Sequence, residues 1–218
     1  MGPIRRLRIA AICAGTGWLV ASLMRSGYGS VGAVAGLFAA ALYIVARSGA
    51  FNSNDAARRW EAGARGERST ARILDRLAAS GWTVMHDRGI PGSKANLDHL
   101  AIGPDGQVVL VDSKQWSGKG AAAVSLRSGR LMCGRYDRQK TVETLQWEAS
   151  RVEAALGVPV TAVIAVHGAP VKGGRLLVAD VQVVGPRRLV DAVMSAPAGP
   201  APTAVLARRA EDGFPQYA

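Results

Sequence analysis

The sequence predicts a domain of the α/β class that follows two apolar N-terminal helices. Short apolar runs rich in β-branched residues, the clearest at residues 107–112, have the character of buried strands. An amphipathic stretch at residues 137–156 separates such runs and has the period of a helix. The apolar stretches at residues 9–24 and 28–46 differ from both, because they are long and carry no charge. Together these patterns indicate a hydrophobic N-terminal region followed by an α/β domain.

Residues 1–50 are expected to form a transmembrane helical hairpin. The second apolar stretch is long enough to cross a bilayer and the first is slightly short, with a polar turn at residues 25–30 between them. Gly32 and Gly36 would let the two helices approach closely. Arginines at both ends of the hairpin outnumber Arg25 in its turn, so the positive-inside rule predicts a multi-pass protein of the cell membrane whose soluble domain lies in the cytoplasm.

Two other interpretations of these stretches stay open. The basic start and the first apolar stretch have the character of a cleaved signal peptide, although the second stretch would still anchor the product. Their richness in alanine and glycine also permits two buried helices of a soluble domain.

The remaining elements are expected in the following order. Residues 51–60 form a polar linker, and residues 61–195 form the α/β domain, which opens with a helix at residues 62–80. Strands are predicted at residues 83–86, 97–103, 107–112, 122–126, 130–133, 160–166 and 181–184. The helix at residues 137–156 stops at Gly157, and a short helix is predicted at residues 186–194. Residues 196–218 begin with a run of Pro and Ala and are expected to be a disordered tail.

Asp98, Asp112 and Lys114 are the candidate functional residues. The strands at residues 97–103 and 107–112 are joined by a turn containing Asp105-Gly106, so they lie side by side. Alternation along a strand places Asp112 and Lys114 on one side and Ser113 on the other. Two acids and one amine are thereby expected to converge at one point.

Phosphodiester hydrolysis uses such a group of residues. Carboxylates hold a hard divalent cation, usually Mg²⁺, which takes the rest of its ligands from water and substrate phosphate. A metal-bound water becomes a usable nucleophile, while the metal and a nearby lysine stabilise charge on the attacked phosphate.

Several motifs in this region occur in the order and spacing of a known family. They are Gly63-x-x-Gly66-Glu67, Leu97-Asp98-His99-Leu100, Asp112-Ser113-Lys114 and a glutamine on the following helix, here Gln146. In these motifs the chain resembles the nuclease-related domain (NERD) family of the PD-(D/E)xK nuclease superfamily, over roughly residues 61–194. The resemblance implies a restriction-endonuclease-like fold, in which helices flank a mixed sheet. This chain has Asp112 where glutamate is frequent in the family, so the metal would have to lie closer to the strand.

The resemblance also implies a role for each residue. Asp98, Asp112, the backbone carbonyl of Ser113 and Glu67 would bind Mg²⁺ or Mn²⁺. Lys114 would orient or activate the attacking water, and Gln146 would be a supporting polar group. The expected activity is that of a membrane-anchored, divalent-metal-dependent nuclease.

Each of these residues also has a structural interpretation. Glu67 suits the first turn of a helix, and Asp112 with Lys114 could form an ordinary surface ion pair. Gln139 lies on a similar helix face and could replace Gln146 in the family position. A Ser113–Lys114 nucleophile–base pair is disfavoured because adjacent strand residues point to opposite faces.

The three histidines are expected to lie outside the metal site. His99 alternates away from Asp98, and it is therefore interpreted as a structural residue, as are His86 and His167.

Charge gives weaker information about partners. Of the formal net charge of +11, residues 1–60 supply +6 and residues 61–195 supply +5. A modest positive excess on the domain fits a nucleic-acid partner, with DNA expected ahead of RNA, and the hairpin would add the lipid bilayer. The competing hypothesis is a non-catalytic nucleic-acid-binding or scaffolding module with a nuclease-like fold.

Overall fold

A computed structural model describes residues 18, 21–22, 25, 53–116 and 123–217. The hairpin predicted over residues 1–50 therefore lies almost entirely outside the described residues. Among the helices that are described, none combines the length and apolar character that a bilayer crossing requires.

The domain is built on a mixed six-stranded sheet with the strand order β1-β2-β3-β7-β9-β8. Strands β1, β2 and β3 pair antiparallel, β3, β7 and β9 pair parallel, and β8 returns antiparallel to β9. The sheet comprises β1 (Thr83–Gly89), β2 (Asn96–Ile102), β3 (Val108–Gln115), β7 (Thr161–His167), β8 (Arg175–Val178) and β9 (Val181–Val184). The predicted turn between β2 and β3 is confirmed, because Gly103 and Gln107 close it through a 2.8 Å backbone hydrogen bond.

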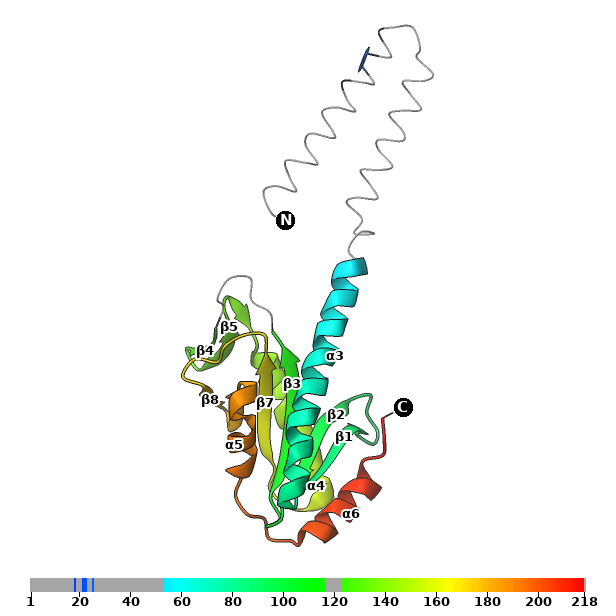
Figure 1. Cartoon of the computed structure of the whole chain (residues 1–218), viewed down its shortest axis with the longest axis vertical. Helices are drawn as coiled ribbons and strands as arrows, with labels where there is room; N and C mark the ends of the chain where they lie inside the picture. The colour runs from blue at the N-terminus through cyan, green and yellow to red at the C-terminus, as the bar shows by residue number, and fades with distance from the viewer. Residues whose placement is uncertain (1–17, 19–20, 23–24, 26–52, 117–122, 218) are drawn as a thin grey trace. The chain divides into compact units, whose positions relative to one another are not determined.

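Helices cover both faces of this sheet (Figure 1). They are α3 (Ser53–Asp75) with the short helix η2 (Arg76–Ser80), α4 (Gln139–Leu156), α5 (Leu189–Met194) after η3 (Pro186–Arg188), and α6 (Thr203–Gly213). Buried residues of α3, η2 and α5 pack with one set of alternating strand residues, including Val109 and Val111. Residues of α4 and α6 pack with the other set, including Leu110 and Ile164. The α/β architecture of a sheet flanked by helices is thus as predicted.

A smaller sheet precedes α4. It contains β4 (Val124–Arg127), β5 (Arg130–Cys133) and the two-residue strand β6 (Tyr136–Asp137). The β4–β5 hairpin turns through Ser128-Gly129 as predicted, with both residues at positive φ. The chain then enters α4, which ends where predicted, at Gly157 with φ 72°.

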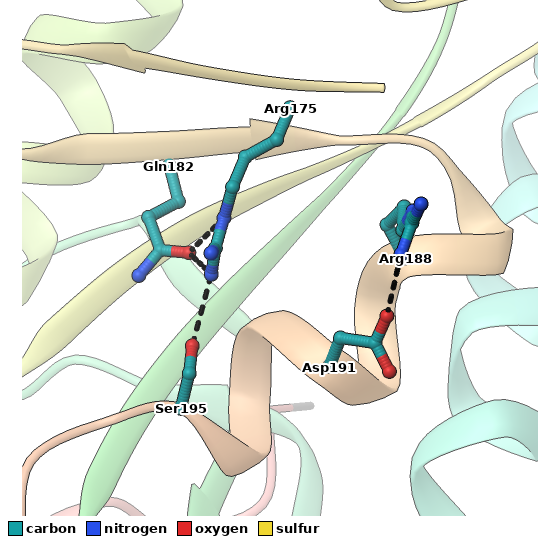
Figure 2. Close-up of polar contacts among 5 residues, drawn as sticks. All are labelled: Arg175, Gln182, Arg188, Asp191 and Ser195. Carbon is teal, nitrogen blue, oxygen red and sulfur yellow. Dashed lines mark hydrogen bonds and ion pairs between the residues drawn. The ribbon is translucent and has the colours of Figure 1, made fainter. Parts of the chain in front are cut away.

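Strand β8 was not among the predicted elements, and it is tied to the helix on its face of the sheet. The Arg175 guanidinium donates to Oε1 of Gln182 on β9 and to Oγ of Ser195 just after α5, the latter at 2.9 Å. A separate bond joins Arg188 to Asp191 across the start of α5 (Figure 2). The Arg175–Ser195 bond links the end of α5 to β8, whereas the Arg188–Asp191 bond is local to the start of the helix.

Two expectations about the ends of the domain were wrong. The polar linker expected at residues 51–60 is helical from Ser53 onward, because its alanines and arginines are good helix formers whether or not they face a core. The tail at residues 196–218 is not disordered, since it contains α6 and buries Leu206, Ala210 and Phe214.

The connection before α6 explains why this tail packs. Gly199 donates its backbone N–H to the Asp105 carbonyl, and Thr203 donates its hydroxyl to the Gly103 carbonyl. A Cβ atom at Gly199 would overlap the carbonyl oxygen of Gly106, so only glycine fits this crossing of the β2–β3 turn. Beyond α6, Tyr217 donates its N–H to Asp87 of β1, so the chain end also covers part of the sheet edge.

Candidate functional site

A cavity of about 340 Å³ lies between the ends of β2 and β3 and the first half of α4. It is lined by Asn96, Asp98, Asp112, Lys114, Asp137, Arg138, Lys140, Thr141, Thr144 and Glu148. The register pairs His99 of β2 with Val111 of β3, so Asp98 and Asp112 are the next residues along the two strands. The sheet thus brings together the three residues that the sequence singled out, Asp98, Asp112 and Lys114.

Asp112 is a buried charged residue of this cavity, with 8% of its surface exposed. Its Oδ1 atom accepts a 2.5 Å hydrogen bond from Lys114 Nζ, whereas its buried Oδ2 atom has no hydrogen-bond partner among the described residues. Burial, opposed by the Lys114 charge and assisted by the Asp98 charge, raises the pKa of Asp112 to about 7. A buried carboxylate oxygen without a hydrogen-bond partner costs folding free energy, and a bound cation would supply the missing interaction.

Lys114 and Asp98 complete the centre of the cavity. Burial favours the neutral amine, but the Asp112 and Asp98 carboxylates outweigh burial and raise the pKa of Lys114, so the ammonium form prevails. Asp98 is half-buried and its Oδ2 accepts the Ser113 backbone N–H at 2.9 Å. That bond fixes the carboxylate beside the end of β3.

Glu148 is a third carboxylate of the cavity, and the sequence analysis missed it. It lies on α4 with 8% of its surface exposed, and burial together with the Asp112 and Asp98 charges raises its pKa to about 7. The signal was available, because Glu148 interrupts the apolar helix face formed by Leu145, Ala149 and Val152. An acid on a face that packs against a sheet needs a partner or a function.

Gln146 does not reach the cavity, which corrects the prediction that it supports the site. Its side chain is exposed, and Nε2 donates to the Ala179 carbonyl between β8 and β9 at 2.8 Å. The alternative Gln139 is also engaged elsewhere, where its Oε1 accepts the Leu131 N–H. Neither is among the residues that line the cavity.

Glu67 occupies an intermediate position. It does not line the cavity, but burial and the charges of Asp98 and Asp87 raise its pKa, so it lies within electrostatic reach of the site. The neighbouring Gly66 lets α3 approach the sheet closely, since a Cβ there would lie 3.2 Å from Gln115 Oε1. The helix itself begins at Ser53, so Glu67 lies in its interior and the first-turn interpretation of this acid is wrong.

The histidines lie on the other face of the sheet or away from the cavity, as expected. His99 is bonded to His86 at 2.8 Å and to Ser113 Oγ at 3.1 Å, and His86 continues to Asp75. Burial and the neighbouring His86 lower the pKa of His99 to about 3, so its imidazole is neutral. His167 is bonded to Thr70. The Ser113 side chain belongs to this opposite face, which excludes a proton transfer between Ser113 and Lys114.

The donor set of the cavity suits a hard divalent cation of the magnesium type. Within the described part of the chain, no three His, Cys, Asp or Glu side chains are close enough together to enclose a metal on their own. Magnesium does not require this, because it is commonly held by one or two carboxylates and keeps waters or substrate phosphate as its other ligands. Asp98 and the free oxygen of Asp112 supply that minimum.

Comparison with known proteins adds one finding. The family model NERD, described as nuclease-related domain, matches residues 62–167, a segment that includes α3 from Ala62, strands β1 to β7 and all of α4. No curated protein and no solved structure matches the chain significantly.

Proposed function

Because the chain carries a nuclease-related domain of the PD-(D/E)xK type over residues 62–167, we propose that it is a membrane-anchored, divalent-metal-dependent nuclease that hydrolyses phosphodiester bonds of nucleic acid. The observation that carries this proposal is the buried, unpartnered Oδ2 atom of Asp112 in a cavity shared with Asp98 and Lys114. Most buried carboxylate oxygens of structural ion pairs are hydrogen-bonded, so an oxygen without a partner among the described residues favours a site that takes a ligand.

Asp98 and Asp112 would hold Mg²⁺ or Mn²⁺, with the Ser113 carbonyl as a further oxygen ligand. Glu67, which does not line the cavity, would contribute its charge and not a ligand atom. When bound, such a cation supplies an activated water and neutralises charge on the phosphate. Glu148 would add a negative charge that strengthens cation binding from the α4 side of the cavity. The protein's own contribution is to hold these oxygens in place before substrate arrives, as the Ser113 N–H does for Asp98.

Lys114 would act on the substrate side of the site. Its ammonium pairs with Asp112. From this position the Lys114 ammonium would orient the attacking water and donate to an oxygen of the attacked phosphate.

The direct test is a panel of end-labelled DNA and RNA substrates incubated with Mg²⁺ or Mn²⁺. Metal-dependent cleavage, with DNA cut faster than RNA, is the expected result. Nucleic-acid binding that does not depend on the metal, without cleavage of any substrate, would instead support the non-catalytic scaffolding module.

Cation affinity should increase steeply with pH around neutrality. The pKa values of Asp112 and Glu148 are raised to about 7, so a fraction of both groups is protonated at pH 6 and must release a proton before a cation binds. Above pH 8 both are ionised. We expect the dissociation constant for Mg²⁺ to fall by roughly tenfold or more between pH 6 and pH 8. Isothermal titration calorimetry in two buffers of different ionisation enthalpy would measure both affinity and proton release, and a pH-independent affinity would contradict the assignment.

Membrane anchoring through residues 9–24 and 28–46 has its own test. We expect the full-length protein to sediment with membranes and to require detergent for release, because two uncharged stretches would lose favourable lipid contacts in water. A tag at the C-terminus should resist added protease until the cell membrane is opened, if the domain faces the cytoplasm. Recovery of the full-length protein in the soluble fraction without detergent would exclude the anchor.

A further inference from the structure

Arg138 lines the same cavity as Asp112 and Lys114, but it enters from a different part of the chain. It immediately precedes α4, after the small sheet of β4, β5 and β6. Its guanidinium carbon lies 5.2 Å from the ring centroid of Trp116 and 5.8 Å from that of Tyr136. The two rings come from segments on either side of the hairpin, so the fold itself assembles this arrangement.

No carboxylate neutralises Arg138 among the described residues. The adjacent Asp137 is already engaged, because it accepts Arg130 Nε at 2.8 Å and the Gln139 N–H at 2.7 Å. Arg138 Nε is buried and has no hydrogen-bond partner in the described part of the chain. A buried donor without an acceptor costs free energy, so this arginine is held in a position that is unfavourable unless something else binds it.

The aromatic contacts indicate what that partner is. Rings that stack on a guanidinium occupy its faces and leave the N–H groups in its plane available. Those groups match the oxygens of a phosphate, to which arginine donates in a bidentate manner. Lys140, Thr141 and Thr144 line the cavity beside Arg138 and add a positive charge and two hydroxyl donors.

We propose that Arg138 binds a phosphate of the nucleic-acid strand next to the one that is cleaved, and that Trp116 and Tyr136 are positioning residues that hold its guanidinium. This inference rests on the proposed nuclease function and assigns the substrate-binding side of the same cavity. Lys114 and the carboxylates act at the scissile phosphate, whereas Arg138 sets where the strand lies. Arginine is required because lysine has neither the planar stacking face nor the paired donors.

The test separates binding from cleavage. Binding of a short fluorescein-labelled single-stranded DNA to the full-length protein would be measured by anisotropy, with Ca²⁺ in place of Mg²⁺, over a range of salt concentrations. We expect Arg138→Ala to weaken binding by about tenfold and to reduce the slope of log K against log[salt] by about 0.7, the value for one lost phosphate contact on a single strand. A merely structural role would change affinity without changing this slope.

Three variants make the result specific. Arg138→Lys should keep the salt slope but bind more weakly, because the charge remains while the bidentate contact is lost. Tyr136→Leu should weaken binding with little change in slope, because it removes a ring that lies against the Arg138 guanidinium but leaves the charge of Arg138, and that of Arg135 on the same ring, in place. Arg151→Ala is the matched control, an exposed arginine of α4 that does not line the cavity, and it should change neither quantity appreciably.

The outcomes distinguish this inference from the function on which it rests. If the unsubstituted protein cleaves DNA with Mg²⁺ but Arg138→Ala binds with the same affinity and salt slope as Arg151→Ala, the role of Arg138 is wrong and the nuclease proposal stands. If the unsubstituted protein neither binds nor cleaves nucleic acid, both are overturned.

Discussion

Replacement of Asp112 by asparagine is expected to reduce metal-dependent cleavage by at least about a hundredfold. Asparagine keeps the size of the side chain but removes the charge that would hold the cation, and it also removes the ion pair with Lys114. Lys114→Ala should lose a comparable factor for a different reason, because the cation still binds while the phosphate charge is no longer offset. Initial rates on labelled DNA over a range of Mg²⁺ concentrations would separate the two. Even at high Mg²⁺ concentration, neither variant should regain the maximal rate of the unsubstituted protein.

Gln146→Ala provides the matched control for both substitutions. Gln146 is a polar residue of the same domain that the family resemblance placed in the site and that the structure places outside it, bonded to Ala179. It should cleave at a rate within about twofold of the unsubstituted protein, as expected for an exposed polar contact. Full activity of Asp112→Asn or Lys114→Ala would refute the site assignment, and a large loss in Gln146→Ala would mean that α4 is rotated relative to the arrangement described.

Phe214→Ala should destabilise the domain by about 3–5 kcal/mol, the cost typical of deleting a buried aromatic side chain. Phe214 follows α6 and is only 2% exposed, in the cluster formed by α4, α6 and one face of the sheet. The loss of stability would be measured by urea denaturation of the full-length protein in detergent, with tryptophan fluorescence as the signal for unfolding. Because the segment closes over the β2–β3 turn, a looser C-terminal segment should also leave that turn less protected from hydrogen exchange.

Arg208→Ala is the control for this experiment. Arg208 is exposed on the same helix, so its substitution should change the free energy of unfolding by no more than about 0.5 kcal/mol. If residues 196–218 were a disordered tail, as their composition had indicated, neither substitution would change the free energy of unfolding. Equal denaturation midpoints for Phe214→Ala and the unsubstituted protein would therefore contradict the packing of α6 and Phe214 and support a disordered tail at residues 196–218.

The family resemblance and the core of the candidate site were accessible from sequence for a local reason. A strand's side chains alternate by backbone geometry alone, so Asp112 and Lys114 share a face wherever β3 lies in the sheet. The Asp-Gly turn fixes the neighbouring strand, and with it the position of Asp98 next to Asp112. The amphipathic period of α4 and its stop at Gly157 are local in the same sense.

The helix side of the cavity depends on contacts that are distant in sequence. Whether Gln146 or Glu148 faces the sheet is decided by the rotation of α4, which follows from how Leu145, Ala149 and Val152 pack into the core. Likewise, the composition of residues 196–202 by itself indicates disorder. The segment is ordered because Gly199 contacts the β2–β3 turn, which lies about a hundred residues earlier in the sequence.

The sequence by itself thus determined the α/β class, the strand ends and the identity of the acids and the amine, because periodicity and turn chemistry act within a few residues. Only the tertiary structure decided that Glu148 and Arg138 join them and that Gln146 does not. The physical reason is that close packing of whole elements, and not local propensity, selects which side chains of a helix or loop enter a shared cavity.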